Sequence, residues 1–122
     1  DLAPLTAYPD KGALIESCRR QLDGCSSAPK VMVIGSAGRC GAGAAELFRE
    51  LDLEVTLWDL EETRDGGPFE EILEHDVFVN CVFVSKPIPP FLTPEFLNRP
   101  RRLSIICDVS CDPSGDLNPL PL

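Results

Sequence analysis

The chain has 122 residues, which is enough for one domain with a sizeable core. Its 43% hydrophobic and 25% charged residues are ordinary proportions for a globular protein. A net charge of −9 argues against nucleic acid or an anionic membrane as a partner, because both attract basic surfaces. No apolar run approaches the roughly 18 residues of a membrane-spanning helix, so no membrane segment is expected.

The first predicted element is a helix at 11–22. Asp10 precedes it and is a suitable N-cap, because an aspartate side chain accepts hydrogen bonds from the first helical turn. Residues 1–29 are predicted to be an interdomain connection that carries this helix. The apolar face of the helix contains Ile15, Cys18 and Leu22.

The stretch KVMVIGSAGRCGAGAAE predicts a nucleotide-binding unit. Val31–Ile34 is an apolar run typical of a buried strand; it leads into Gly35, Gly38 and Gly41, and a helix is predicted at 41–51. In such a unit the free N–H groups and the positive dipole at the helix start bind a pyrophosphate. We expect Gly35 to allow the sharp turn, Gly38 to allow close approach of a ligand, and Gly41 to allow close packing of the helix.

The glycine spacing alone leaves several ligands open. The pattern is G-x-x-G-x-x-G, which is one residue longer in its first gap than the usual G-x-G-x-x-G. Flavin sites, S-adenosylmethionine sites and purely structural turns use similar runs of glycine. The longer loop has the spacing for a pyrophosphate, which favours a dinucleotide over S-adenosylmethionine.

An acidic residue after the second predicted strand narrows the choice. Residues 54–58 alternate polar and apolar side chains and predict a strand, and Asp59 follows it, 24 residues after Gly35. An acid about 20 residues beyond the glycine motif accepts hydrogen bonds from adenosine ribose hydroxyls. NAD is expected rather than NADP, because Asp59, Glu61 and Glu62 offer no cation to a 2′-phosphate. Glu61 and Glu62 are otherwise interpreted as solvated residues of an acidic helix start.

Short helices and apolar strands alternate in the rest of the chain. The run VFVNCVFV at 77–84 predicts a strand buried on both faces of a parallel sheet. This alternation predicts an α/β protein with a Rossmann-like doubly wound parallel sheet, here a roughly four-stranded part of a larger fold. Residues 30–122 are thus expected to be an incomplete Rossmann-like NAD-binding domain. The other predicted elements are a turn at 64–68, a helix at 68–74, a loop at 85–90, a helix at 94–97 capped by Thr93, a strand at 103–107 and a loop at 108–122.

The six cysteines show no C-x-x-C spacing, so no metal site is predicted. An even number is compatible with a disulfide scaffold, but the α/β pattern favours a reducing compartment and mostly free thiols. Cys40 and Cys81 each fall at the C-terminal end of a predicted strand, on the edge where ligands bind. We predict that they lie within disulfide reach, with Cα atoms less than about 7 Å apart.

Four segments of the chain, in the same order, resemble one enzyme family. They are GSAGRCGAGA, LWDLEETRDGGPFEEI, DVFVNCVFVSKPIPPF and CDVSCDPSGDLNPLP. Together they resemble the NAD-binding domain of the L-lysine-forming saccharopine dehydrogenases, from about Tyr8 to Leu122. Alanine dehydrogenases are related by fold and are an alternative amino-acid dehydrogenase family, but the GGPF and SKP segments favour saccharopine dehydrogenase.

The resemblance implies a reaction and the residues that serve it. Saccharopine would be oxidised with NAD and water to L-lysine, 2-oxoglutarate and NADH in the α-aminoadipate pathway of lysine biosynthesis. Ser110, Cys111 and Asp112 would border the substrate, although no chemistry is assigned to Cys111. The cofactor would be bound by the motif glycines Gly35, Gly38 and Gly41, by Arg39 near the pyrophosphate, by Asp59 and Thr63 at the adenosine ribose, by Phe83 in the cofactor pocket and by Val109 toward the nicotinamide.

The resemblance also implies that the general acid and base, a lysine and a histidine, lie in another domain of a longer polypeptide. The single histidine here, His75, is expected at the surface far from the glycine loop, and Lys86 is expected to be solvated. No residue of this chain is therefore predicted to be catalytic, and the chain alone is expected to be inactive. A cytoplasmic location is expected, with a peroxisomal one left open. The alternative from another class is an NAD-sensing module without chemistry, although Ser110 and Asp112 favour an enzyme.

Overall fold

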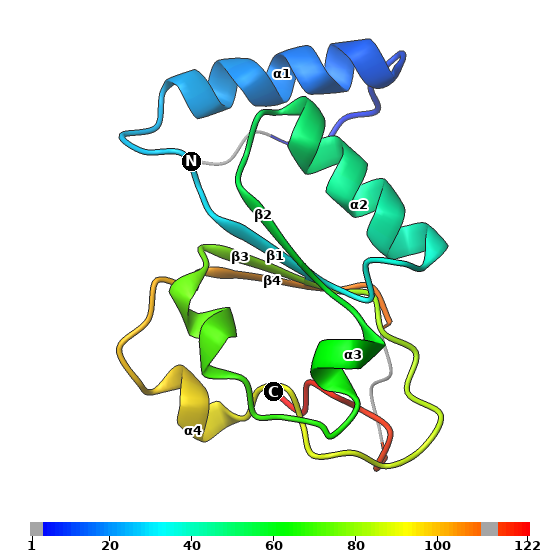
Figure 1. Ribbon diagram of the computed structural model, residues 1–122. Coiled ribbons are helices and arrows are strands. Elements are labelled where there is room, and N and C mark those ends of the chain that lie inside the picture. The colour runs from blue at the N-terminus through cyan, green and yellow to red at the C-terminus, as the bar shows by residue number, and fades with distance from the viewer. Residues whose placement is uncertain (1–3, 111–114) are drawn as a thin grey trace.

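The computed structural model describes residues 4–110 and 115–122 and contains a four-stranded, entirely parallel sheet (Figure 1). The strand order is β2-β1-β3-β4. Helices lie on both sides of the sheet, so the predicted α/β, Rossmann-like architecture is confirmed. The elements are α1 (Lys11–Asp23), β1 (Val31–Ile34), α2 (Arg39–Glu50), β2 (Val55–Trp58), α3 (Leu60–Thr63), the 3₁₀-helix η1 (Glu70–Glu74), β3 (Val77–Asn80), α4 (Pro94–Leu97) and β4 (Ile105–Asp108).

The chain reverses its direction across the sheet at β1. The chain leaves β1 to form β2 along one flank of β1, and it then returns past β1 to form β3 along the other flank. The loops after β1 and β3 therefore leave on opposite sides, and ligands of such sheets bind in the crevice between them. We call the edge where all four strands end the carboxyl edge, and the edge where they begin the amino edge. The register aligns the last residues of the strands, which are Ile34, Trp58, Asn80 and Asp108.

β1 lies between two layers, and this explains its continuous apolar sequence. Met32 and Ile34 are buried in a core with residues of η1 and of the loops on the lower side of the sheet in Figure 1. Val31 and Val33 are buried on the other face, where Phe48 of α2 packs against the same cluster. A strand covered on both faces carries apolar side chains on both, as in a buried parallel sheet.

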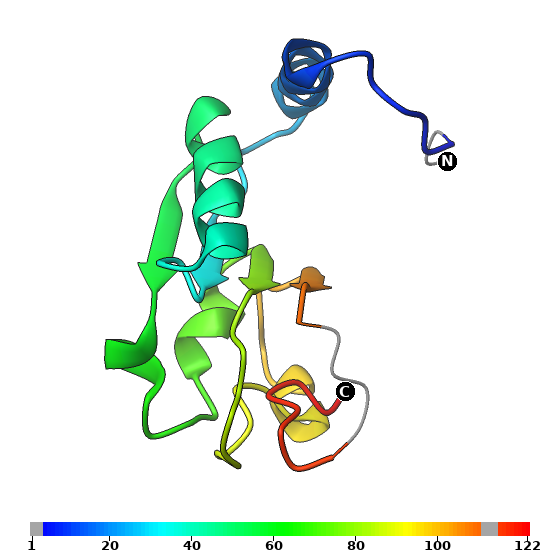
Figure 2. The same cartoon turned by 90° about the vertical axis from the view of Figure 1, so that its right-hand side faces the viewer.

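The helix α1 is less integrated than α2. None of its residues is buried, and Figure 2 shows it at the periphery, on the far side of α2 from the lower core. Lys11 Nζ lies 2.8 Å from Glu46 Oε1 and 2.5 Å from Glu50 Oε1, so exposed ion pairs join the two helices. The helix α2, in contrast, packs against β1, β2 and β3.

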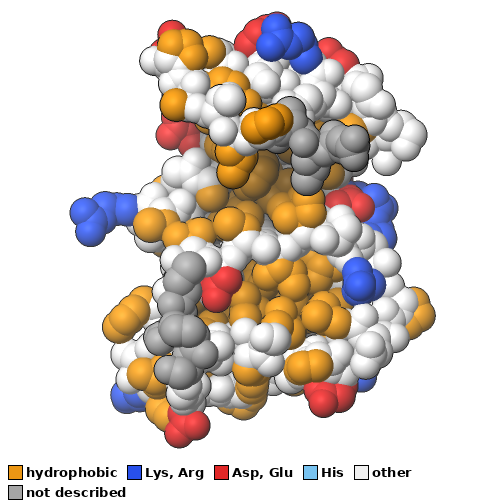
Figure 3. Space-filling model, turned by 180° about the vertical axis from the view of Figure 1, so that it is seen from behind, with side chains coloured by type: hydrophobic (Ala, Val, Ile, Leu, Met, Phe, Trp, Pro, Cys, Tyr) orange, Lys and Arg blue, Asp and Glu red, His pale blue; other side chains and the backbone are white. Residues whose placement is uncertain are grey.

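The edge strand β4 is less covered than the strands under α2, and the side chain of Ile105 in β4 is 55% exposed. Figure 3 shows hydrophobic side chains gathered in a hollow on the back of the molecule.

Most predicted elements at the start of the chain are confirmed. The helix beginning at Lys11 has the expected cap, because Asp10 Oδ1 accepts a hydrogen bond from Ala13 N at 2.8 Å. The strand at 31–34 has the predicted bounds. The helix predicted at 68–74 is instead a 3₁₀-helix that begins at Glu70. No helix in the described part of the chain has the length and apolar character needed to cross a membrane.

The strand predicted at 77–84 is wrong beyond Asn80. Cys81 N still donates to Ile34 O at 2.9 Å, but Val82 N donates to the Asn80 side chain at 3.3 Å. The neighbouring strands end at Ile34 and Asp108, so residues 81–84 have no partner for a ladder. The apolar sequence continues because Val84 is buried outside the sheet.

Candidate functional site at the carboxyl edge

Two of the three motif glycines are required by the fold itself. Gly35 has a φ of +86°, a conformation that residues with side chains rarely adopt, and a Cβ there would lie 2.8 Å from the carbonyl carbon of Cys81. Gly41 is buried in the first turn of α2, and a Cβ there would lie 2.0 Å from the carbonyl oxygen of Gly35. These contacts agree with the sharp turn and the close helix packing expected of the two glycines.

Gly38 has a different place in the loop. It is the N-cap of α2 with a φ of −73°, and a Cβ there would meet the Gly35 oxygen at an ordinary 3.4 Å. The fold therefore does not require glycine at this position. No side chain caps α2, so its first N–H groups and the positive end of its dipole are available to an acceptor from outside. Uncapped helix starts of this kind are common phosphate-binding sites, and Gly38 lines the cleft beside this one.

Asp59 joins the end of β2 to the glycine loop. Its Oδ2 accepts a hydrogen bond from Ala37 N at 2.6 Å, and its Oδ1 accepts one from Leu60 N at 2.8 Å. The acid that the sequence assigns to a ribose thus lies beside the loop assigned to a pyrophosphate. An ionised carboxylate has about four acceptor positions, so both oxygens retain acceptor capacity for a ligand.

Glu62 and Thr63 both hold Asp59. Glu62 is an exposed residue of an acidic helix start, as expected, and its Oε2 also accepts from Asp59 N at 2.7 Å and completes a capping box. The Asp-x-x-Glu spacing at the start of α3 is the sequence pattern that predicts this contact. The buried Thr63 donates its hydroxyl to Asp59 O at 2.8 Å. Thr63 therefore lies near the expected ribose position, and its hydroxyl helps to hold the Asp59 backbone.

Two clefts open at the carboxyl edge and share residues 81–83 as a common wall. Phe83 lines both clefts, and its side chain is 86% exposed. The first cleft, of about 340 Å³, contains Gly35, Gly38, Asp59, Leu60, Thr63 and Phe83. The second cleft, of about 360 Å³, contains Cys40, Phe83, Val109, Ser110, Leu117 and Pro119. Seven of the predicted cofactor and substrate residues thus line one or both clefts.

The sequence interpretation missed the part that Asn80 plays in the second cleft. This buried amide donates from Nδ2 to Asp108 Oδ1 at 2.9 Å and links the ends of β3 and β4. Val109 N donates to Asn80 O at 2.9 Å, and the Ser110 hydroxyl donates to the carbonyl of Val82. Asn80 and Ser110 therefore fix the loops that border the second cleft. The sequence signal for this role was the position of Asn80 as the single polar residue in an apolar strand.

Cys40 and Cys81 line the second cleft as unbonded thiols. The pKa of Cys81 is raised, first because the thiol is partly buried and then because Cys40, Cys107 and Asp108 are nearby negative or potentially negative groups. A raised pKa lowers the thiolate fraction and hence the reactivity at neutral pH. The predicted Cα separation of Cys40 and Cys81 stays a prediction.

The other predicted residues lie in several places. Arg39 is exposed at the first position of α2 and, like Gly41, lines neither cleft. Lys86 lines a smaller hollow of about 200 Å³ beside the first cleft, together with Thr63 and Phe83. Cys111 and Asp112 lie outside the described residues.

His75 is distant from the glycine loop, as expected, but it is not simply solvated. It follows η1 at the amino edge, where Nδ1 lies 2.7 Å from Glu71 O and Nε2 lies 2.8 Å from Thr56 Oγ1. A carbonyl oxygen only accepts, so Nδ1 carries a proton and, in the neutral ring, Nε2 accepts from Thr56. Both nitrogens are thus engaged in joining η1 to β2, which gives His75 a structural role.

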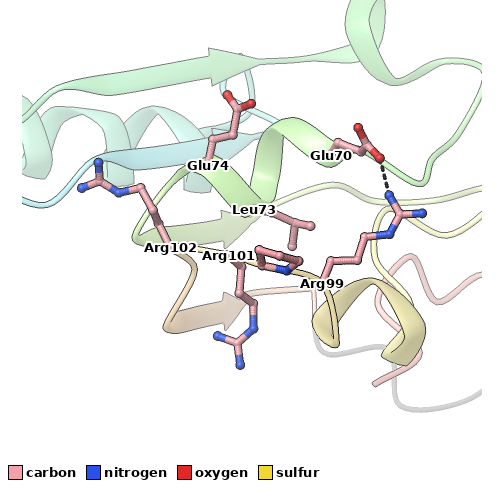
Figure 4. Close-up of a pocket in the computed structure, with 7 residues that line it drawn as sticks. Glu70, Leu73, Glu74, Arg99, Arg101 and Arg102 are labelled. Atoms are coloured by element: carbon pink, nitrogen blue, oxygen red, sulfur yellow. Dashed lines mark hydrogen bonds and ion pairs between the residues drawn. The ribbon is translucent and has the colours of Figure 1, made fainter.

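A hollow more spacious than either cleft lies at the amino edge, away from them. It has a volume of about 490 Å³ and is lined by Glu70, Leu73, Glu74 and residues 99–102 (Figure 4). Figure 4 shows that the guanidinium groups of Arg99, Arg101 and Arg102 diverge and do not point at one centre. Among the described residues, no group of three or more His, Cys, Asp or Glu side chains could hold a metal ion.

No protein-family model matches the sequence, but curated proteins do. The saccharopine dehydrogenase (NAD(+), L-lysine-forming) of Candida albicans is 42% identical over 131 residues, covering 100% of this chain and 34% of that protein. Proteins of the same name from Emericella nidulans and Schizosaccharomyces pombe are 43% and 42% identical, over 99% and 94% of this chain. The resemblance in the four sequence segments is thus confirmed. The chain spans about a third of the length of the curated relatives it matches.

Proposed function

We propose that the carboxyl edge binds NAD and that this chain is the cofactor-binding part of a saccharopine dehydrogenase. The observation that carries the proposal is the convergence of Gly38, the uncapped start of α2 and Asp59. It is the arrangement expected for a pyrophosphate next to an adenosine ribose. The relatives are named for NAD(+) and for the formation of L-lysine, which supports the choice of cofactor and reaction.

Each part of the site has a task in this proposal. The N–H groups at the start of α2 bind the pyrophosphate, with Arg39 as an exposed cation close by. Asp59 accepts hydrogen bonds from the ribose hydroxyls. The exposed apolar side chains of Phe83 and Val109 contact the cofactor toward its nicotinamide end and exclude water there. Bound NAD supplies the hydride acceptor.

The reaction proposed for the whole enzyme is oxidation of saccharopine by NAD and water to L-lysine, 2-oxoglutarate and NADH. Ser110 borders the second cleft, on the side where the substrate would lie. Proton transfer requires a general acid and base. Among the described residues, neither a histidine nor a lysine lines the two clefts, and Lys86 lines only the smaller hollow beside them. The proposal therefore assigns the acid and base to the portion of the enzyme that this chain does not span.

Calorimetric titration of the 122-residue chain with NAD tests the proposal. Gly38→Ala should weaken NAD binding by at least about tenfold, or 1.4 kcal/mol, because Gly38 lines the first cleft and an added methyl group there would reduce the space proposed for the pyrophosphate. Gly43→Ala is the matched control in the same helix, since a Cβ there has nothing within 4 Å. It should leave the NAD affinity unchanged and stabilise the helix by up to about 1 kcal/mol. Equal NAD affinities of the two variants, with intact circular dichroism spectra, would contradict the proposal.

An activity assay tests the division of labour. The 122-residue chain supplied with saccharopine and NAD should produce no NADH above background, because no lysine or histidine is among the described residues that line its two clefts. Turnover of about 1–10 per second, a typical enzyme rate, would show that this chain does contain the catalytic groups. Lys86 and Asp112 would then be the side chains to substitute first.

A further inference from the structure

Asp59 is held by its neighbours at both its backbone and its side chain. Its N–H donates to Glu62, and its carbonyl oxygen accepts from the Thr63 hydroxyl at 2.8 Å and from Thr63 N at 3.2 Å. Its two carboxylate oxygens accept from Leu60 N and Ala37 N. The carboxylate is therefore oriented before any ligand binds, and it is attached to the glycine loop.

Among these contacts to Asp59, the one from Glu62 is the only one that a charged and exposed side chain makes. A helix as short as α3, with four residues, is not stable by itself, so the capping box matters for its geometry. The neighbouring Glu61 has the same charge and is also exposed, but no hydrogen bond or ion pair joins it to another described residue. The chain thus offers two adjacent glutamates, of which one contacts Asp59 and the other does not.

We propose that Glu62 is a positioning residue for cofactor binding. It fixes the Asp59 backbone through the capping box, and Asp59 in turn presents its carboxylate to the ribose and anchors the glycine loop at Ala37. This inference rests on the proposed NAD site and adds to it a residue whose effect passes through Asp59. Pre-orientation of a binding group raises affinity because less ordering is needed when the ligand binds.

The charge of Glu62 and its positioning role have opposite effects on NAD affinity. NAD is an anion, so removal of a nearby carboxylate reduces repulsion and strengthens binding. Loss of positioning weakens binding. The variants Glu61→Ala and Glu62→Ala remove the same charge from adjacent positions, and their comparison therefore separates the two effects.

Calorimetry with NAD on the 122-residue chain tests the inference. Glu62→Ala should raise the dissociation constant by about fivefold, the scale of one lost hydrogen bond. Glu62→Gln retains an acceptor oxygen and should return the affinity to within about twofold of the wild type. Glu61→Ala should bind NAD as tightly as the wild type or more tightly.

A double-mutant cycle distinguishes positioning from a general loss of structure. In an Asp59→Ala background, Glu62→Ala should have no further effect on NAD affinity, because there is no carboxylate left to orient. An equal loss in both backgrounds, or no loss in the wild-type background, would overturn the inference. NAD binding that depends on Asp59 but not on Glu62 would overturn only this inference. Absence of saturable NAD binding by the wild type would overturn the proposed function as well.

Discussion

The amino edge and the carboxyl edge of the sheet satisfy their polar groups in different ways. At the amino edge, Asp76 Oδ2 accepts from Lys30 N at 2.8 Å and from Arg102 Nη2 at 3.0 Å, and Asp76 O accepts from Ser104 N at 3.0 Å. One residue thus ties together the starts of β1, β3 and β4. At the carboxyl edge the start of α2 has no side-chain cap, so backbone donors remain available. The polar groups of the first edge are thus satisfied within the protein, whereas the second edge retains donors for the ligand proposed above.

The hollows at the two edges show why size alone does not identify a binding site. The amino-edge hollow is the larger, at about 490 Å³ against about 340 Å³ for the first cleft. Its arginines already have protein partners, however: Arg99 pairs with Glu70, Arg101 Nε donates to Leu97 O at 3.0 Å, and Arg102 pairs with Asp76. The smaller cleft has converging donors and an acid with remaining acceptor positions. The proposal of the smaller cleft as the binding site therefore rests on available hydrogen-bonding capacity and not on volume.

Substitution of Asp59 should have the largest effect on the carboxyl edge. Asp59→Ala removes the acceptor for the ribose and is expected to weaken NAD binding by about 1–3 kcal/mol, the scale of a lost hydrogen bond to a charged group. Calorimetry of the 122-residue chain measures this. Asp59→Asn, which keeps one acceptor oxygen, should lose less. An unchanged NAD affinity in Asp59→Ala would mean that this acid only caps α3.

The preference for NAD over NADP should be the next largest effect. Asp59, Glu61 and Glu62 concentrate negative charge at the start of α3, beside the ribose position proposed above, so NADP should bind at least about tenfold more weakly than NAD. Paired titrations with the two cofactors measure the ratio. Glu61→Arg, which supplies a cation without touching the capping box, should reduce the preference. Equal affinities of the wild type for NAD and NADP would refute the explanation.

The elements that sequence predicts well are those whose pattern is determined locally. The spacing of apolar residues predicts the buried strand at 31–34 and the helix after it, and the conformational freedom of glycine predicts the turn between them. The structure has these elements nearly where they are expected. The sequence also predicts Asp59 as a candidate from its distance to Gly35, a property of the βα unit, and the structure places it beside the glycine loop. A local pattern was available for Glu62 too, in the form of its capping-box spacing.

The features that sequence misses depend on contacts between distant segments. The end of β3 at Asn80 is determined by where β1 and β4 end, and the hydrogen bond from Asn80 to Asp108 spans 28 positions. The contact of Ala37 with Asp59 spans 22 positions. Neither contact leaves a pattern in adjacent residues, since each requires the assembled sheet.

The amino edge should respond to acid without any change at the cofactor site. The N–H of Lys30, and then the Arg102 guanidinium, hold the pKa of Asp76 below its usual value. A carboxyl whose pKa is lower when folded stabilises the fold above its unfolded pKa of about 3.9, and this contribution is lost as the pH falls through the folded value. Asp76→Asn should therefore lower the urea midpoint near neutral pH, and its difference from the wild type should shrink in acid. Its NAD affinity should be unchanged; a weaker NAD affinity would show that the two edges are coupled.

The smallest effect concerns the two cysteines of the second cleft, which should form a bond only under oxidation. Because the pKa of Cys81 is raised, its thiolate fraction is low at neutral pH, and oxidation by glutathione disulfide should become faster as the pH increases. Peptide mapping should then recover a Cys40–Cys81 pair, while the exposed Cys25 in the loop after α1 serves as a control that should not join either residue. The geometric basis is a Cα separation below about 7 Å. An experimental structure with these atoms more than about 10 Å apart would remove the prediction, since no side-chain rotation could then close the bond.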